Sequence, residues 1–400
     1  MKSLREFLIK EALALARTCS IVCKEKMIAR LYVDNFRCLV NFTLKLGAMN
    51  LLMGANGSGK SATLEVLRLI SAFVSGGVES RDLFPTRTLT RWETRDIQTF
   101  EIDVKGNGGL YTYRFEIEHE RTRERCRLKN EKLLFDGRLL YVADGEKARL
   151  YRDDYSEGPE VICDWFRSGL GIIQKREDNK KLSWFKSQLG RTLVARVNPS
   201  AMLTRSEEEK AHPSYDLSDF VSWLRHLSQE QQEQYYQLTT GLKEQVLEGF
   251  KSFKLVSDGQ NAKTLRLIFG VETKTESGRN SFEIGFDELS DGQRVLVALH
   301  TLASFAFQDG ATLCLDEPEN YLALPEIQPW LLKLLDATQE GKCQAVLVSH
   351  HPELVNFFAS SSGHWFERQG GGQVLVRPVT TTDKSGLSVS ELVARGWLNG

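Results

Sequence analysis

One short segment of the chain has the composition and spacing of a phosphate-binding loop. It fits the pattern G-x-x-x-x-G-K-[ST] and consists of Gly54, Ala55, Asn56, Gly57, Ser58, Gly59, Lys60 and Ser61. Glycines let successive backbone N–H groups surround phosphate oxygens, and the start of a helix adds partial positive charge. We expect Lys60 to reach the β- and γ-phosphates of a nucleotide and Ser61 to ligate Mg2+. The alternative is a glycine-rich turn without a ligand.

Two carboxylates and a histidine end two other apolar runs. Asp316 and Glu317 follow Leu313-Cys-Leu, and His350 follows Ala-Val-Leu-Val-Ser. Unpaired carboxylates are costly at the end of a buried strand, so the pair indicates a site. Beside a bound phosphate, the first carboxylate holds Mg2+ and the second polarises the attacking water. The alternatives are a charge pair at a helix start before Pro318 and a structural, hydrogen-bonding histidine.

A further segment, Leu289-Ser-Asp-Gly-Gln-Arg, precedes an unusually apolar helical stretch over 295–307. Ser290 and the backbone N–H groups near Gly292 are placed to bind a second phosphate group at that helix start. The alternative is an ordinary serine N-cap, which explains Ser290 but not the following Gly292-Gln293 pair.

The elements that must position these residues follow from hydrophobic periodicity. Alternation and apolar runs predict strands over 28–34, 39–46 and 49–53, and helical spacing predicts a helix behind the glycine-rich loop, over 64–70. From about residue 287 to 360 helices and strands alternate again, and a strand over 373–377 and a helix over 389–397 follow. We therefore expect a parallel α/β core built from both ends of the chain.

The middle of the chain has different patterns. They predict an antiparallel β meander over 98–142, a mobile loop over 204–213, helices over 218–227 and 230–248, and a hairpin over 263–286. The expected fold class is α/β, with a mixed core sheet, an antiparallel β lobe and a mainly helical insert. We expect an N-terminal extension over 1–26 and one bilobed domain over 27–400, divided at 27–145, 146–286 and 287–400.

Composition places limits on function. The 400 residues are 41% hydrophobic and 26% charged, with a formal net charge of -1, so any nucleic-acid contact must use a local patch. The seven cysteines include no C-x2-C pair, which supports neither a disulfide framework nor a zinc site. No apolar run spans a membrane, and charged residues interrupt the first 26 positions. We expect a cytoplasmic protein, with Met27 as an alternative start.

Taken in chain order, these segments resemble the Walker A, LSGGQ-like signature, Walker B and switch-histidine segments of ABC-superfamily ATPase heads. G-x-N-G-S-G-K-S, D-E-P-E-N-Y-L and Ser-His-His-Pro-Glu-Leu resemble the branch that contains SMC, RecF and OLD (overcoming lysogenisation defect) proteins. Chains of this size in the branch are usually described as AAA family or ATP-binding proteins. The resemblance covers most of residues 27–360, with the middle matched by architecture, and implies a P-loop NTPase of ABC type.

The resemblance also implies roles for residues. Gly54 to Ser61 would bind the triphosphate of ATP, and Ser61 with Asp316 would place Mg2+. Lys60, Glu317 and His350 would be catalytic, with Glu317 as general base and His350 as γ-phosphate sensor. Ser290, Gly292 and Gln293 would act across a head-to-tail homodimer on the partner's ATP. ATP binding would close this dimer, and hydrolysis would open it.

Three segments match the branch less closely. Asn35-Phe36-Arg37 is similar to its early Asn-Phe-Arg segment, so that Arg37 or Phe36 would touch the nucleotide. Gln98 and Gln174 are both candidates for the Q-loop glutamine. The D-loop lacks its usual acidic residue, since Ala323-Leu324 follows Tyr321-Leu322.

The spacing of the motifs separates the possible classes of ATPase. In transporter ATPases the signature follows Walker A by about a hundred residues, whereas here the separation is much longer and the following helix is nearly uncharged. The long coiled coil of SMC proteins and the TOPRIM nuclease domain of OLD proteins are not expected. We expect a switch ATPase that acts with a separately encoded effector, a nuclease or toxin, in DNA-linked processes or anti-phage and plasmid defence. A RecF-like repair ATPase is the alternative, as is a regulator that binds protein or RNA; an ABC-transporter ATPase subunit is a less favoured alternative.

Two basic stretches are candidate DNA contacts. The first alternates over Arg121, Arg123, Arg125, Arg127, Lys129 and Lys132 along an expected strand. The second surrounds Trp184-Phe185 and consists of Lys175, Arg176, Lys180, Lys181, Lys186 and Arg191. Acidic neighbours dilute both, so solvated charged faces are the alternative.

Overall fold

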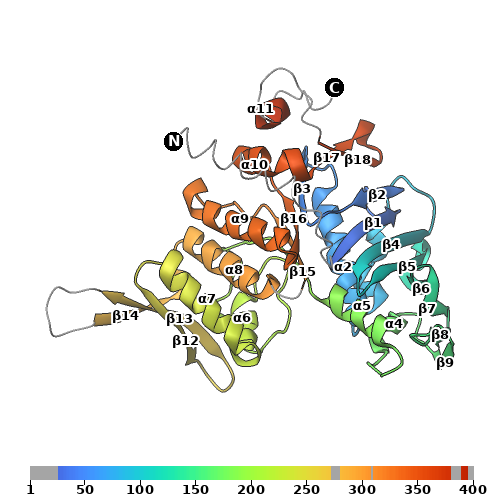
Figure 1. Ribbon diagram of the computed structural model, residues 1–400, viewed down its shortest axis with the longest axis horizontal. Helices are drawn as coiled ribbons and strands as arrows, with labels where there is room; N and C mark the ends of the chain where they lie inside the picture. Colours follow the sequence, from blue (N-terminus) through green and yellow to red (C-terminus); the bar gives the residue numbers. More distant parts are fainter. Residues whose placement is uncertain (1–25, 272–279, 308–309, 380–388, 395–400) are drawn as a thin grey trace.

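The computed structural model describes residues 26–271, 280–307, 310–379 and 389–394. The predicted extension over 1–26 therefore lies almost wholly outside the described residues. An antiparallel sheet and a helical lobe lie on opposite sides of a central parallel sheet (Figure 1). The expected mixed α/β class is confirmed.

The antiparallel lobe is an eight-stranded sheet in the order β2-β1-β4-β5-β6-β7-β8-β9. Its strands are β1 (Met27–Asp34), β2 (Phe42–Lys45), β4 (Ile97–Gly106), β5 (Gly109–Glu120), β6 (Arg125–Phe135), β7 (Arg138–Asp144), β8 (Lys147–Tyr151) and β9 (Glu157–Ile162). Buried residues alternate along β5, as expected for a sheet with one covered face. The predicted meander over 98–142 was too short: two more short strands continue it to Ile162, beyond residue 145.

The central sheet has the order β10-β15-β16-β3-β17-β18. Its strands are β3 (Met49–Gly54), β10 (Thr192–Ala195), β15 (Ala311–Asp316), β16 (Cys343–Val348), β17 (Gly363–Arg368) and β18 (Val374–Pro378), of which β18 alone is antiparallel. The core is therefore not built from the two ends alone, because β10 comes from the stretch predicted as insert. The carboxyl ends of the parallel strands meet at one edge of the sheet.

Helices cover both faces of this sheet. The helices of the described residues are α2 (Lys60–Ser75), α3 (Ser80–Leu83), α4 (Gly169–Ile172), α5 (Lys180–Gly190), α6 (Phe220–Glu230), α7 (Gln232–Gln245), α8 (Asp291–Ala306), α9 (Leu324–Gln339), α10 (Pro352–Ser362) and α11 (Val389–Ala394). Short 3-10 turns are η1 (Thr86–Thr88), η2 (Arg121–Arg123), η3 (Phe286–Glu288) and η4 (Gln369–Gly371). The two helices predicted over 218–248 are confirmed.

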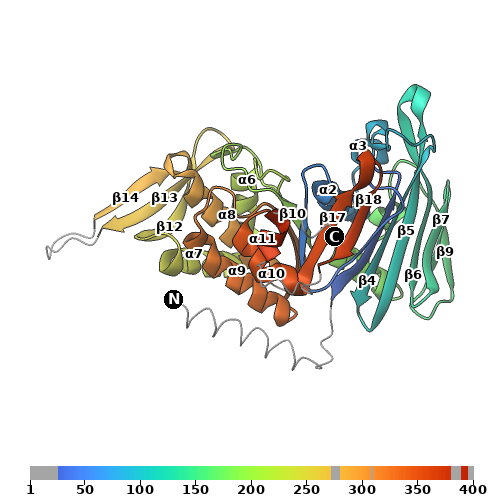
Figure 2. The ribbon, with the colours of Figure 1, turned by 90° about the horizontal axis from the view of Figure 1, so that it is seen from above.

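A small antiparallel sheet extends the helical lobe at the end opposite the β lobe (Figure 2). It contains β11 (Arg205–Ser206), β12 (Phe250–Ser257), β13 (Lys263–Val271) and β14 (Asn280–Gly285). The predicted 263–286 hairpin is the β13–β14 pair, although 272–279 lies outside the described residues. The segment predicted as a loop over 204–213 includes β11, which pairs with β13.

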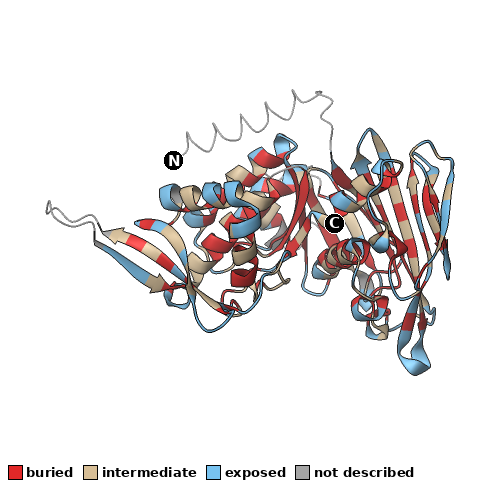
Figure 3. Ribbon diagram, turned by 90° about the horizontal axis from the view of Figure 1, so that it is seen from below, coloured by how far each residue is buried: buried red, intermediate tan, exposed pale blue. Residues whose placement is uncertain are grey.

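Side chains of the central sheet alternate between two hydrophobic cores. On β15, Cys314 belongs to the core shared with α2 and the β lobe, whereas Leu313 and Leu315 belong to the core shared with α6, α8 and α9. The strands are buried on both faces (Figure 3). This explains their continuous apolar sequence, which is typical of parallel sheets covered by helices.

Candidate functional site

The glycine-rich loop joins β3 to α2. Gly54 has φ 139°, and a Cβ there would lie 2.2 Å from the carbonyl oxygen of Phe366, so a side chain does not fit. Lys60 begins α2 and donates to the carbonyls of Gly54 at 2.7 Å and Ala55 at 2.9 Å. Burial lowers the pKa of Lys60, and the negative charges of nearby carboxylates oppose this effect. The hydroxyl of Ser58 is buried without a hydrogen-bond partner, so the loop has polar groups that a ligand would satisfy.

The loop opens into a cavity of about 730 Å³. Of the predicted site residues, the structure places around it Arg37, Asn56, Gly57, Ser58, Gly59, Lys60, Ser61, Asp316, Glu317 and His350. They come from the β1–β2 loop, the β3–α2 loop and the ends of β15 and β16. A volume of this size is typical of sites for small molecules.

The two carboxylates are fixed by neighbours that the sequence did not reveal. The Tyr215 hydroxyl donates to Asp316 Oδ2 at 2.7 Å. Arg196 Nη2 lies 3.2 Å from Glu317 Oε2, which also accepts from Asn320 Nδ2 at 2.9 Å. Glu317 has φ 52°, a left-handed backbone conformation held by a hydrogen bond from its N–H to the carbonyl of the residue ending β16.

Arg196 and Tyr215 lie in one segment between β10 and α6. Arg196 follows β10 as Glu317 follows β15, and its backbone N–H donates to the Tyr215 carbonyl at 2.7 Å. Burial, reinforced by the charge of Asp316, raises the pKa of Tyr215, so its hydroxyl remains a donor. Recognising Leu193-Val-Ala as a core strand would have pointed to Arg196; no sequence signal pointed to Tyr215.

His350 lines the cavity beyond the end of β16. Burial and the positive charge of Lys60 lower its pKa, which favours the neutral imidazole. The preceding Ser349 donates its hydroxyl to Glu319, whose pKa is raised by burial. The next residue, His351, caps α10 by accepting from the Glu353 N–H. The first histidine alone therefore faces the phosphate-binding loop.

The signature-like segment does not line this cavity. Ser290 caps α8, and its side chain and that of Gln293 form a reciprocal capping box. The N-cap interpretation therefore explains Gln293 as well as Ser290, which corrects the expectation that it would not. A Cβ at Gly292 would lie 3.1 Å from the Tyr321 carbonyl oxygen, so the helix start packs closely on the segment after β15.

Neither Q-loop candidate lines the cavity. Gln98 is fully buried and donates to the carbonyl of Asn35 at 3.0 Å and to the Thr88 hydroxyl at 3.2 Å. Its side-chain oxygen lies 2.9 Å from His119 Nε2. Gln174 is exposed, beyond α4. Gln98 is thus a structural residue behind the cavity wall, because its donors are used within the fold.

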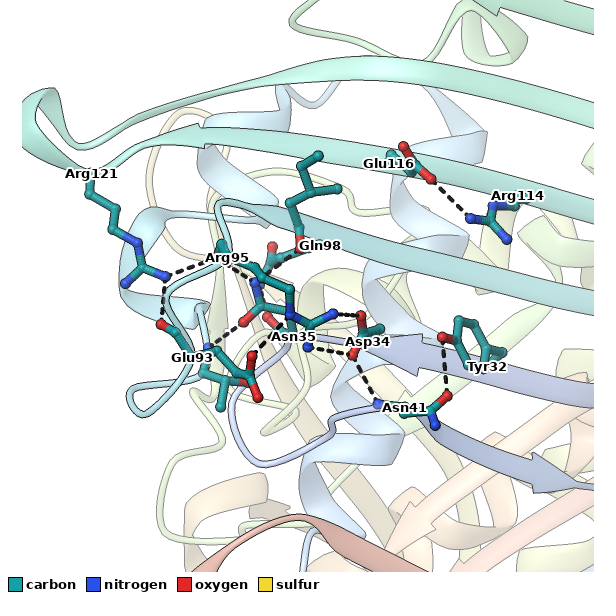
Figure 4. Close-up of polar contacts among 12 residues, drawn as sticks. Tyr32, Asp34, Asn35, Asn41, Glu93, Arg95, Gln98, Arg114, Glu116 and Arg121 are labelled. Carbon is teal, nitrogen blue, oxygen red and sulfur yellow. Dashed lines mark hydrogen bonds and ion pairs between the residues drawn. The ribbon is translucent and has the colours of Figure 1, made fainter.

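Asn35 connects the β1–β2 loop to the loop before β4 (Figure 4). Its side-chain amide donates to the carbonyls of Arg95 at 2.8 Å and Ile97 at 3.0 Å, and its oxygen accepts from the Thr90 N–H at 3.2 Å. Phe36 is fully buried and packs edge-on against Phe100. Of the two residues expected as alternative nucleotide contacts, Arg37 lines the cavity and Phe36 does not.

The same two loops supply an outer wall that the sequence analysis missed. Arg37 lines the cavity and pairs with Glu65 at 2.7 Å. Arg87, Arg91 and Trp92 line it as well, together with Arg368 from the end of β17. Nothing in their spacing indicates a site, since they meet only through the tertiary fold.

Only part of the first basic stretch forms a strand face: Arg125, Arg127 and Lys129 are exposed at alternate positions of β6. Arg121 and Arg123 lie in η2, where Arg121 pairs with Asp96 at 2.6 Å. Arg127 pairs with Glu118 at 2.6 Å. Neighbouring carboxylates thus neutralise part of the charge that the sequence suggested.

In the second basic stretch the aromatic pair belongs to the fold. Phe185 is fully buried, and Trp184 stacks on Tyr111 with 5.1 Å between ring centroids. Lys181 donates to the Asp153 carbonyl at 2.7 Å, and Lys186 donates to backbone carbonyls before α5. Both rings and these two lysines therefore make their contacts within the fold.

Two domain families match successive parts of the chain. Residues 27–194 match the family described as "AAA ATPase domain". Residues 194–356 match the family described as "AAA domain, putative AbiEii toxin, Type IV TA system". In the described part of the chain no helix has the length and apolarity to cross a membrane.

Comparison with individual proteins agrees with these matches. The chain is 23% identical over 378 residues to an OLD nuclease of Thermus scotoductus, covering 90% of this chain but only 66% of that protein's length. A crystal structure of an SMC head bound to the C-winged-helix domain of ScpA has a similar fold, with TM-score 0.50, 13% identity and coverage of 88% of this chain and 98% of that one. An SMC head domain from Thermotoga maritima gives TM-score 0.44, 14% identity and coverage of 88% and 99%. The two family matches, the OLD relative and the SMC-head fold therefore support an ABC-superfamily ATPase of the SMC/RecF/OLD-like branch.

Proposed function

We propose that the chain is a Mg2+-dependent switch ATPase that hydrolyses ATP to ADP and phosphate. The observation that supports this most directly is the meeting of Lys60, Asp316, Glu317 and His350 around one cavity. These groups come from distant parts of the sequence. Phosphoryl transfer to water requires cations that stabilise the phosphate charge and a group that accepts a proton from water, and side chains of both kinds are present here.

Lys60 would bind the β- and γ-phosphates. It donates to two loop carbonyls, and a triphosphate would offer stronger, charged acceptors in their place. Ser61 and Asp316 supply the hydroxyl and carboxylate oxygens that suit Mg2+. When bound, Mg2+ would neutralise charge on the β- and γ-phosphates.

Glu317 would accept a proton from the attacking water. Asn320 and Arg196 orient its carboxylate through one oxygen, Oε2, which leaves Oε1 for the water. The neutral His350, beyond the end of the neighbouring strand β16, would donate a hydrogen bond to the γ-phosphate.

We propose that 27–400 acts as a single bilobed domain and that two copies associate head to tail. Ser290, Gly292 and Gln293 lie outside their own cavity, which is compatible with contact to a partner's ATP. ATP binding would then close the dimer and hydrolysis would open it.

We propose the cellular process that this switch ATPase serves from the names of the proteins and families that the chain resembles. The matched OLD protein is named as a nuclease, and one matched family is described with a toxin–antitoxin system. We propose that ATP-dependent switching controls a separately encoded nuclease or toxin in DNA-linked processes or anti-phage and plasmid defence. DNA is one candidate trigger.

Steady-state ATPase assays with and without Mg2+ and duplex DNA test this function. Lys60→Ala should abolish ATP binding and turnover, whereas Lys333→Ala, far from the cavity on α9, should not. Stimulation by DNA would favour DNA as the trigger. Mg2+-independent turnover, or turnover that survives Lys60→Ala, would refute the assignment.

A further inference from the structure

The outer end of the cavity combines one exposed ring with several cations. Trp92 is 45% exposed although it lines the cavity, and the Arg368 guanidinium lies 5.0 Å from its ring centroid. Arg37, Arg87 and Arg91 surround them. The carboxylates Asp316 and Glu317 line the same cavity, so acidic and cationic groups share it.

This wall is ordered by the fold before any ligand arrives. The buried Asn35 side chain holds the loop that contains Arg91 and Trp92, through its bonds to Thr90 and Arg95 (Figure 4). Arg368 is fixed by donation to the carbonyls of two glycines in the β17–β18 turn, at 2.5 and 2.8 Å. A rigid, half-exposed aromatic face costs little further ordering when a flat ligand stacks on it.

We propose that Trp92, backed by Arg368, binds the base of the nucleotide by stacking, and that the pocket accepts GTP as well as ATP. This inference rests on the proposed function, since it places the triphosphate on the P-loop. Stacking on an aromatic side chain uses the π-face that every base has, and purines offer the larger face.

The hydrogen-bonding groups of the wall explain why the pocket should not discriminate between adenine and guanine. Arginine and tryptophan side chains donate hydrogen bonds and accept none. Guanine presents two acceptors, O6 and N7, along one edge, whereas adenine presents N7 beside an amino donor. These arginine and tryptophan side chains therefore offer no acceptor to the adenine amino group and can pair with guanine.

Binding measurements on the full chain test the proposal, with ATP, GTP, CTP and inorganic tripolyphosphate as probes in the presence of Mg2+. ATP and GTP should bind within about fivefold of each other and more tightly than CTP. Trp92→Ala should weaken ATP and GTP alike, by about 5- to 100-fold for the loss of one stacked base. It should leave tripolyphosphate affinity within twofold, and Trp92→Phe should restore most of the loss.

Phe357→Ala, which removes another half-exposed ring on α10, is the matched control and should change nothing. The proposal is overturned if Trp92→Ala binds ATP like the wild type, or if ATP is preferred to GTP by 50-fold or more. It is also overturned if Trp92→Ala loses tripolyphosphate as strongly as ATP, because the effect would then not concern the base. If wild-type protein binds no triphosphate of any kind, the proposed function itself fails.

Discussion

Replacing Glu317 with glutamine separates its proposed chemistry from its structural contacts. The substitution keeps the shape of the side chain and one oxygen that can accept from Asn320. It removes the negative charge that pairs with Arg196 and the basic oxygen that would accept a proton from water. We therefore expect turnover to fall while folding and ATP binding persist.

The two effects differ greatly in size. The Arg196–Glu317 pair has side chains 53% and 28% exposed, and a pair this exposed contributes less than about 1 kcal/mol. Loss of a general base slows a reaction by about 10²- to 10⁴-fold, which is about 3–5 kcal/mol of activation free energy. Stability should therefore change little while kcat falls at least a hundredfold.

The assay is steady-state ATP hydrolysis beside ATP binding and urea denaturation of the same preparations. Arg196→Gln is the matched control, because it breaks the same ion pair but leaves the carboxylate. Arg196→Gln should retain turnover within about tenfold. If Glu317→Gln hydrolyses ATP at the wild-type rate, or if the two variants lose the same amount, Glu317 is not the general base.

Three further predictions follow from buried polar groups. Asn35→Ala should lower the free energy of unfolding by about 2–4 kcal/mol, because it leaves one buried and two part-buried backbone groups without their partner. Tyr215→Phe should raise the Mg2+ concentration for half-maximal turnover by about tenfold, because Asp316 loses the hydrogen bond that orients it. Burial, with Arg121 nearby, lowers the pKa of His119 to about 4, below its usual value of about 6.5. The unfolded chain therefore binds the proton first as pH falls, and between pH 7.5 and 5 His119 should remove about 2 kcal/mol of stability.

Each of these three predictions has a control variant and an outcome that would contradict it. Asn41→Ala, at an exposed position in the same β1–β2 loop, should cost less than about 1 kcal/mol in urea denaturation, and an equal cost would contradict the clamp assigned to Asn35. Tyr236→Phe, on the exposed face of α7, should leave the Mg2+ dependence unchanged. An unchanged Mg2+ dependence in Tyr215→Phe would contradict the role of its hydroxyl in orienting Asp316. His119→Gln should flatten the loss of stability towards pH 5, and an unchanged slope would assign that loss to other groups.

The sequence predicted the phosphate-binding end of the site because that end is local. Gly54 to Ser61 are contiguous, and Asp316, Glu317 and His350 each end an apolar run. Parallel strands bring their carboxyl ends to one edge of the sheet, regardless of the structure of the connections between them. Their place around one cavity therefore followed from strand direction alone, without knowledge of the intervening lobes.

The other half of the cavity depends on contacts that spacing does not encode. Trp92 follows a 3-10 turn, and Arg368 ends a strand that the patterns did not predict. They meet because β17 pairs with β3 while Asn35 fastens the loop before β4. Gln98 shows the opposite kind of error. Its residue type suggested a catalytic loop, but its side chain satisfies buried backbone and hydroxyl groups.

The four-residue strand β10 explains why the carboxylate partners were missed. A run of four residues is too short for periodicity to separate it from the helices around it, yet its pairing with β15 places Arg196 beside Glu317. The segment after it then connects both cores: Tyr215 packs against the core of α2 and the β lobe, and Leu217 lies in the core of the helical lobe. Because Tyr215 and Arg196 each bind one of the two carboxylates, we expect a displacement between the two cores to alter the hydrogen bonds to Asp316 or Glu317. The segment over 196–217 thus connects the core of the helical lobe to the proposed Mg2+ and general-base residues through side chains outside β15.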